Sequence, residues 1–176
     1  MTDWPEMVRL HGPLVWRIVY RLVGREADAA DCFQEAFVAA LEVSRKGPVE
    51  NWPGLLTHLA TARAIDLLRR RVAREAAQRP LDADAGGFGV RPDATAAERE
   101  LRDGLRTALA VIDPRQAEAF CLACLDDLPY RDVADRLGVT VSHVGVLIHR
   151  ARDALKRHLK KHDPSRTTTR TEETRT

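Results

Sequence analysis

The charged side chains of this 176-residue chain are sorted into one acidic segment and two basic segments. Residues 26–42 carry five carboxylates and no lysine or arginine, whereas residues 63–79 carry six arginines and residues 141–161 carry six lysines and arginines. The formal net charge is only +2, so the separation lies in the pattern and not in the total. Dense basic groups suit the phosphates of a nucleic acid, and clustered carboxylates suit a positive partner surface. Solvated helix faces are the simpler interpretation, and charge alone favours it.

The sequence contains no arrangement typical of catalysis or metal binding. Cys121 and Cys124 have the spacing of half a zinc site, but no second cysteine pair or spaced histidine pair follows, and structural zinc needs four ligands. We therefore expect both thiols on an apolar helix stripe beside Phe120. The glycine-rich stretch GGFG lacks the lysine and the flanking strand and helix of a phosphate-binding loop. The sequence predicts no enzyme activity, no metal and no cofactor.

Composition and hydropathy argue against secretion and membrane insertion. Charged residues make up 31% of the chain, and the mean hydropathy is −0.33. No apolar run approaches the ~20 residues that span a bilayer. The first residues lack the basic start and apolar stretch of a secretory signal. Three cysteines are too few for a disulfide framework and suit a reducing compartment, so we expect a cytoplasmic protein.

Helical periodicity runs through the N-terminal half of the chain. One apolar stripe ends at Gly24, a second contains Phe33 and Phe37, and a third helix is expected over about residues 55–78. No segment alternates between apolar and polar residues for long enough to predict a strand. The first stripe consists of Leu10, Leu14, Val15, Ile18, Val19 and Leu22.

The C-terminal half predicts shorter helices that end in a helix-turn-helix. Residues 130–137 and a helix from about residue 141 to residue 160 are joined by Gly138, whose left-handed conformation would stop the first helix. Thr140 or Ser142 would cap the second helix. A helix pair of this kind with a basic second helix is typical of DNA binding. The side chains expected to pack inward from the second helix are Val144, Ile148, Ala151 and Leu155.

These elements predict an all-α fold of two small helical domains joined by a flexible linker. We expect the domains at residues 5–78 and 98–161, the linker at residues 79–97 and a disordered tail at residues 162–176. The linker is rich in glycine and proline, and the tail has almost nothing to bury.

Four segments occur in an order that resembles a known family. DCFQEAF at residues 31–37 is similar to a D-x-x-Q-E-x-F stretch, and residues 55–71 are similar to a helix that ends in an aspartate and an arginine cluster. LPYRDVADRLG at residues 128–138 and HRAR at residues 149–152 look like the two helices of a DNA-reading domain. Together they resemble the extracytoplasmic-function sigma factors, the smallest members of the sigma-70 family, over roughly residues 5 to 160. The resemblance implies a protein that binds core RNA polymerase and directs it to promoters.

The resemblance implies region 2 at residues 5–78 and region 4 at residues 98–161. The acidic helix of region 2 would lie against the basic β′ coiled coil of polymerase through Asp31, Gln34 and Glu35, because carboxylates and an amide pair well with arginines. Region 4 would contact the β flap, and an anti-sigma factor is a further expected partner. The alternatives are a stand-alone helix-turn-helix regulator and a sigma-like interaction protein without promoter recognition.

Promoter DNA would be read at two places. The −10 element would meet phosphate-binding arginines of the third helix and Trp52 in the preceding loop, which would stack on a flipped base. A Trp52 side chain folded onto the core is an equally favoured alternative. The candidate −10 arginines are Arg63, Arg69, Arg70 and Arg71. The candidate −35 residues are Ser142, His143, Val146, His149, Arg150, Arg152 and Arg157.

The chain departs from the family pattern at two positions on these helices. Ala62 replaces a usual asparagine of the third helix, so that polar contact to the promoter is absent. Gly145, Val146 and Leu147 replace the lysine, serine and arginine found in many relatives. We therefore expect fewer phosphate contacts and a more apolar reading face, with Val146 against a thymine methyl group.

Overall fold

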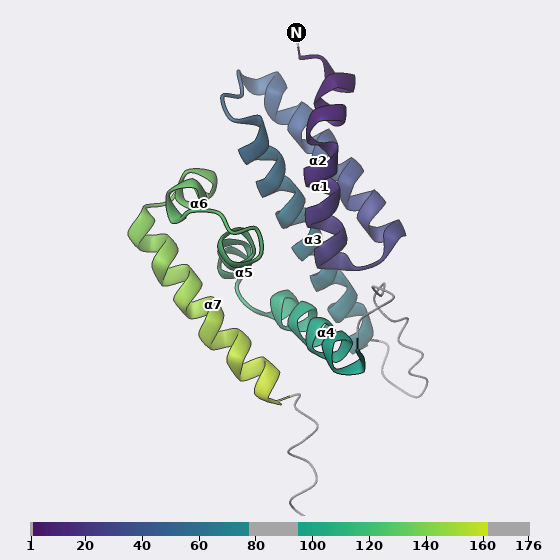
Figure 1. Cartoon of the computed structure of the whole chain (residues 1–176), viewed down its shortest axis with the longest axis vertical. Helices are drawn as coiled ribbons and strands as arrows, with labels where there is room; N and C mark the ends of the chain where they lie inside the picture. The colour runs from purple at the N-terminus through teal and green to yellow at the C-terminus, as the bar shows by residue number, and fades with distance from the viewer. Residues whose placement is uncertain (1, 78–94, 162–176) are drawn as a thin grey trace, which may run out of the picture.

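The computed structural model describes residues 2–77 and 95–161. Every regular element in these two ranges is a helix, which confirms the all-α prediction. None of the helices in the described ranges combines the length and apolar character that a bilayer crossing requires. Figure 1 labels the helices, which are α1 (Trp4–Val23), α2 (Glu26–Lys46), α3 (Trp52–Ala77), α4 (Ala96–Val111), α5 (Pro114–Phe120), the π-helical turn η1 (Cys121–Leu125), α6 (Tyr130–Leu137) and α7 (Val141–Lys161).

Helices α1, α2 and α3 pack against one another as a three-helix bundle (Figure 1). Val15, Ile18 and Leu22 of α1 are buried in it, as their spacing predicted. The prediction for Leu10 was wrong, because this side chain is 60% exposed. At 100° per residue Leu10 lies about 140° around the helix from Val15, which places it outside the buried stripe.

Helix α3 begins three residues earlier than the sequence predicted. The Asn51 side chain accepts a hydrogen bond of 2.8 Å from the backbone N–H of Gly54, so Asn51 caps the helix. Trp52 is therefore the first residue of α3 and not part of the loop before it. Helix α3 reaches Ala77, close to its expected end.

Helix α4 also begins earlier than predicted, because Thr95 and Glu98 form a capping box. The Thr95 hydroxyl accepts from the Glu98 backbone N–H at 3.2 Å, and the Glu98 carboxylate accepts from the Thr95 backbone N–H at 2.7 Å. The last residues of the expected linker, Ala96 and Ala97, therefore belong to α4. Residues 79–94 of that expected linker and the expected tail at 162–176 lie outside the described residues.

The helix-turn-helix is confirmed in α6 and α7. Gly138 ends α6 in the left-handed conformation with φ of 63°, and the Thr140 hydroxyl caps α7 by accepting from the His143 N–H at 3.2 Å. The four side chains expected to pack inward from α7 are all less than 5% exposed. They pack in two clusters, Val144 and Ile148 with α6 and Ala151 and Leu155 with the larger core.

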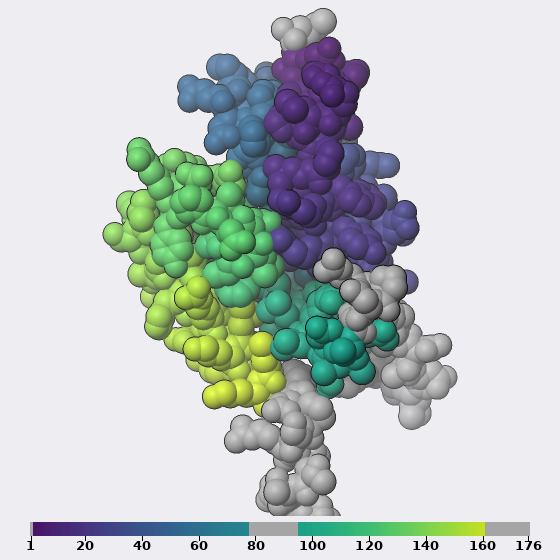
Figure 2. Space-filling view, in the orientation of Figure 1, coloured from purple at the N-terminus to yellow at the C-terminus, as the bar shows by residue number. Residues whose placement is uncertain are grey.

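The two halves of the chain lie directly against each other (Figure 2). Helix α3 contacts α4, α5 and α6, and one buried cluster takes side chains from both halves. Ile65 of α3 and Ile112, Ala117 and Cys121 of the C-terminal half belong to this cluster and are at most 4% exposed. The expectation of two helical regions holds, and their shared core is a feature that the sequence did not predict.

Candidate protein and nucleic-acid interfaces

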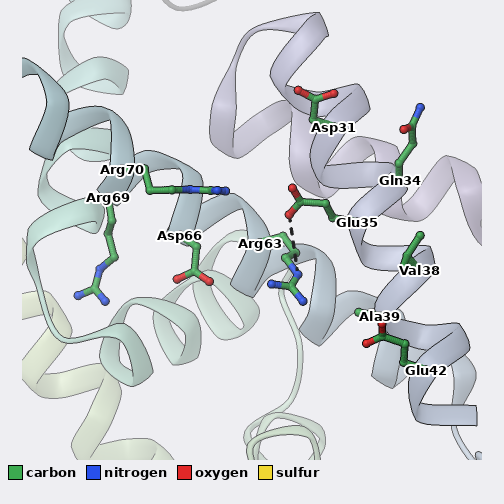
Figure 3. Close-up of a pocket in the computed structure, with 10 residues that line it drawn as sticks. All are labelled: Asp31, Gln34, Glu35, Val38, Ala39, Glu42, Arg63, Asp66, Arg69 and Arg70. Carbon is green, nitrogen blue, oxygen red and sulfur yellow. Dashed lines mark ion pairs between the residues drawn. The ribbon is translucent and has the colours of Figure 1, made fainter.

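A groove of about 820 Å³ runs between α2 and α3 (Figure 3). It brings together two groups of residues that the sequence assigned to different partners, the acidic set of α2 and three arginines of α3. Carboxylates and guanidinium groups therefore face each other across one surface. The groove is lined by Asp31, Gln34, Glu35, Val38, Ala39, Glu42, Arg63, Asp66, Arg69 and Arg70.

Asp31, Gln34 and Glu35 are all exposed on α2. Their exposure follows from helical spacing, because Cys32 and Ala36 take the buried stripe of the same helix. Burial raises the pKa of the Cys32 thiol to about 12, with the nearby carboxylates of Glu35 and Asp28 acting in the same direction. The polar groups on the exposed face are therefore available to a partner, while the thiol behind them stays protonated.

Arg63 faces Glu35 across the groove, with Arg63 Nε 4.0 Å from Glu35 Oε2 (Figure 3). Both side chains are more than a third exposed, so the pair adds little stability and a partner can separate it. Two further carboxylates, Glu42 and Asp66, line the groove but were not assigned a role from the sequence. The signal was available, since Glu42 follows Glu35 by seven residues and Asp66 follows Arg63 by three, which are same-face spacings.

The four arginines proposed for the −10 element are not equivalent in the structure. Arg70 is exposed in the groove. Arg69 is half-buried and donates to the backbone carbonyls of Ala110 at 3.1 Å and Ile112 at 2.6 Å. Arg71 forms an ion pair with Asp28. Arg69 and Arg71 therefore have internal partners. The sequence prediction did not foresee them, because these partners lie 41 to 43 positions away along the chain and are brought close only by the packing of the helices.

Trp52 lies in α3, and its side chain packs against Trp4 and the main core. Its ring meets the ring of Trp4 edge to face, with centroids 5.6 Å apart, and both are packed against the main core. Of the two interpretations left open by the sequence, the structure favours packing on the core. Trp52 is half-buried, so only part of its side chain is exposed to a partner.

The outer face of α7 carries the residues proposed for the −35 element. Ser142, His143 and Val146 are exposed in its first two turns, and Val146 is 43% exposed. Leu147, the third of the residues that depart from the family pattern, is only 5% exposed and packs against α6. It lies one position beyond Val146, and this 100° rotation turns it inward. Further along the same face lie His149, Arg150, Arg152 and Arg157, all of them exposed.

One acidic residue on this face was not assigned a role from the sequence. Asp153 is exposed, and its Oδ2 lies 3.5 Å from Nδ1 of His149. His149 and Asp153 are four residues apart and thus share one side of the helix. The reading face of α7 is therefore not uniformly basic, because Asp153 places a carboxylate beside His149.

The two C-terminal cysteines take part in packing, as the sequence predicted. Cys121 is fully buried, and burial raises the pKa of its thiol. Cys124 is half-buried, and its Sγ accepts from the Arg152 guanidinium at 3.4 Å. Within residues 2–77 and 95–161, no group of three or more histidine, cysteine or acidic side chains could hold a metal ion.

Both halves of the chain match models of one protein family. Residues 7–74 match the model described as Sigma-70 region 2, and residues 102–155 match the model described as Sigma-70, region 4. The first match covers most of α1 to α3, and the second covers most of α4 to α7. The two matches stand in the order that the sequence motifs suggested.

Several curated proteins are similar to most of the chain. The ECF RNA polymerase sigma factor SigE of Mycolicibacterium smegmatis is 31% identical over 163 residues, which cover 92% of this chain and 63% of SigE. The chain therefore spans less than two thirds of that relative. The ECF RNA polymerase sigma factor SigW of Bacillus subtilis is 24% identical over 176 aligned residues, which cover 88% of each protein. The ferric citrate uptake sigma factor FecI of Escherichia coli is 27% identical over 124 residues, 70% of this chain and 72% of FecI.

A solved structure has the same fold. It is the sigma factor RpoE from Bartonella quintana, crystallised with the anti-sigma factor NepR, and it is similar with a TM-score of 0.57 and 17% identity. The likeness covers 93% of this chain and 100% of RpoE. At this identity it supports the arrangement of helices and not the residues of any site.

Proposed function

Because this chain belongs to the sigma-70 family, among its extracytoplasmic-function members, we propose that it binds core RNA polymerase and directs it to specific promoters. The observation that carries the proposal is the occurrence of region 2 and region 4 in order, each on its own set of helices. Residues 5–78 would act as region 2 and residues 98–161 as region 4. In this role the chain is not an enzyme, since polymerisation belongs to its partner, and it would act in the cytoplasm beside polymerase.

The groove between α2 and α3 supports the polymerase-binding part of the proposal. The exposed carboxylates of Asp31 and Glu35 and the amide of Gln34 form an acceptor-rich edge that suits arginines of the β′ coiled coil. Val38, 56% exposed beside them, offers an apolar contact that a partner can bury. On binding, an arginine of the partner would replace Arg63 beside Glu35.

The exposed faces of α3 and α7 support the DNA-binding part. Arg63 and Arg70 of α3 would contact phosphates of the opened −10 strand, where backbone charge holds the strand without reading it. The first turns of α7 would enter the major groove at the −35 element, as in other helix-turn-helix proteins. Val146 there presents methyl groups suited to thymine.

Further partners follow from the family. The β flap of polymerase would receive region 4. RpoE is seen with the anti-sigma factor NepR, and we infer that this chain too has an anti-sigma partner. Its fold leaves the groove and the α7 face exposed, so either surface offers such a partner a place to compete with polymerase or DNA.

In vitro transcription with core polymerase and a promoter library tests the proposed function. We expect transcripts from a defined subset of promoters that share −10 and −35 sequences, and none without this chain. A stand-alone regulator would instead bind its duplex site without polymerase. A sigma-like interaction protein would bind core polymerase and start no transcripts, and either result would overturn the proposal.

A further inference from the structure

An arginine of region 4 binds the C-terminal end of a helix of region 2. Arg106 of α4 is 4% exposed and donates to the carbonyls of Leu22 at 2.8 Å and Arg21 at 3.0 Å. These carbonyls belong to the last turn of α1, where no intrahelical donor remains and the helix dipole is negative. Arg106 is therefore a buried cation at the C-terminal end of α1.

Region 2 makes the same contact in the opposite direction. Arg69 of α3 donates to the carbonyls of Ala110 and Ile112 at the end of α4. Arg21 of α1 donates to the carbonyl of Leu125 at 2.5 Å, at the end of η1, and also pairs with Asp126. Each region thus supplies an arginine to a helix end of the other.

Two further features hold the same interface together. His58 Nδ1 of α3 lies 2.5 Å from Glu118 Oε1 of α5, and Glu118 is only 9% exposed. Ile112, Ala117 and Cys121 are buried in the core shared with α3. Separating the regions would expose these apolar side chains to water and break the hydrogen bonds between the arginines and the helix-end carbonyls, so the closed arrangement is the stable form of the free chain.

The closed arrangement is too small to read a promoter at both elements, an argument that rests on the proposed function. The −10 and −35 elements are about 25 base pairs apart, or roughly 85 Å at 3.4 Å per pair. A compact chain of this length has a radius of gyration of about 16 Å and a diameter of roughly 40 Å.

We propose that the reciprocal arginine contacts form an autoinhibitory latch, which closes region 4 onto region 2 and withholds Arg69 from DNA. Arg69 is central to this latch because it also lines the groove between α2 and α3. In the closed form its guanidinium is bound to carbonyls of α4, and in the open form the same donors reach a phosphate. Closure and strand binding therefore compete for one side chain.

A chain cut between the regions tests closure directly. A protease site is placed between Gly86 and Gly87, the full-length protein is cleaved, and the products are separated by gel filtration without denaturant. We expect the two fragments to elute together. Fragments that elute apart from the otherwise unchanged chain would overturn the proposal.

Arg106→Met is the variant designed to open the latch, because it keeps the aliphatic stem and removes the donors. Its matched control is Arg99→Met, which removes the same charge from an exposed position on the same helix. We expect cut Arg106→Met fragments to separate and cut Arg99→Met fragments to stay together. Co-elution of both variants would show that the arginine contacts do not hold the regions together.

Gly24→Ala is a second variant that should break the Arg106 contact, and it replaces Arg106→Met if that variant does not fold. A Cβ at Gly24, which has φ of 75°, would lie 2.5 Å from the Arg106 guanidinium and displace it without changing α4. Gly138→Ala is its control, since Gly138 has φ of 63° and no atom within 4 Å of an added Cβ. We expect fragment separation with Gly24→Ala only, and equal behaviour of the two variants would count against the latch.

Binding of a labelled single-stranded oligonucleotide of 12 thymines tests whether Arg69 is withheld. We expect uncut Arg106→Met to bind at least about threefold tighter than the parent although it has lost a positive charge. The gain should disappear when Arg69→Ala is added. Equal binding by the parent and Arg106→Met, including no detectable binding by either, would overturn the masking of Arg69.

The transcription assay runs in parallel on the same preparations. A chain that stays closed when cut but starts no promoter-specific transcripts would leave the contact intact and count against the proposed function. A chain that directs transcription but falls apart when cut would count against the latch. The two proposals therefore fail in different ways.

Discussion

Acidic and basic side chains line the same groove between α2 and α3, so a partner that binds one kind of side chain also meets the other. Glu35 and Arg63 face each other, and Asp66 and Arg70 line the same surface. A partner that binds the carboxylates must supply cations that compete with Arg63. A partner that binds the arginines must compete with the carboxylates. Protein and DNA binding at this groove are therefore expected to influence each other.

Reversing two charges tests the acidic edge of the groove. The double variant Asp31→Lys, Glu35→Lys should bind core polymerase at least about tenfold more weakly, a loss of ~1.4 kcal/mol. Both residues are exposed, so the free energy of unfolding should change by no more than about 0.5 kcal/mol. Competition for core polymerase and urea unfolding are the two measurements.

The control for this charge reversal is Glu75→Lys, Glu100→Lys, which makes the same change in net charge at exposed positions outside the groove. It should compete for polymerase like the parent. If the groove variant also competes normally, or if it unfolds early, the assignment of Asp31 and Glu35 to polymerase binding is wrong.

Sequence reasoning located the charged residues but did not find their internal partners. Exposure of Asp31, Gln34 and Glu35 followed from helical spacing, which is a local property. The contacts of Arg69 with Ala110 and of Arg71 with Asp28 join residues more than 40 positions apart. No local pattern encodes them, and arginines in a basic run look alike until the tertiary structure assigns each a neighbour.

The elements themselves were easier to predict than their first residues. Gly138 and Thr140 mark the turn before α7 correctly, because a left-handed glycine and a capping hydroxyl act on adjacent backbone. The starts of α3 and α4 were placed too late. The first turn of α3 contains Pro53 and Gly54, which are typical of loops, and the first turn of α4 has no large apolar side chain, so periodicity alone did not reach back to the caps Asn51 and Thr95.

Helix α7 should contain two classes of side chain with different effects on DNA binding. Alanine at Arg150 or Arg157 should weaken all promoters about equally and reduce the salt slope of binding by roughly one unit, because a phosphate contact carries no sequence information. Substitution of Val146 or His149 should change the preferred −35 sequence, by roughly 1–3 kcal/mol per base pair. Promoter selection at several salt concentrations measures both effects.

Asp153→Asn is the informative companion variant on α7, because it removes the carboxylate beside His149 and leaves the helix face otherwise unchanged. It should strengthen binding to all promoters by removing repulsion from phosphates. If Val146 and His149 variants keep the parent's −35 preference while an arginine variant alters it, the face of α7 that reads DNA has been assigned wrongly.

For the whole molecule, the important feature is the contact between regions that the sequence treated as separate. The shared core and the contacts of Arg69 and Arg106 make one closed body from two family regions. Glycine and proline content suggested a linker, and this was the local basis for expecting independent domains. The composition of this segment shows only that the sequence between the regions has no apolar period. It carries no information on whether the regions pack together.

The cross-region pair His58–Glu118 should make the closed form depend on pH. The short contact with Glu118 raises the pKa of His58 and outweighs burial, which lowers it. A histidine whose folded pKa is raised contributes stability that is complete below its unfolded pKa of about 6.5 and is lost as pH rises through the folded pKa. The free energy of unfolding should therefore be higher at pH 6 than at pH 8, by up to about 1 kcal/mol for a partly exposed pair.

Urea unfolding at pH 6, 7 and 8 measures this dependence. His58→Asn should flatten the slope, whereas His149→Asn, which breaks an exposed pair on α7, should leave it unchanged. Asp126 is another acid at the interface. Burial raises the pKa of its carboxyl group, and Arg21 acts in the opposite direction. Comparing each variant with the parent removes the contribution of Asp126. A parent slope that survives His58→Asn would place the titrating group elsewhere. Loss of the slope together with easier separation of the cut fragments at pH 8 would link protonation of His58 to closure.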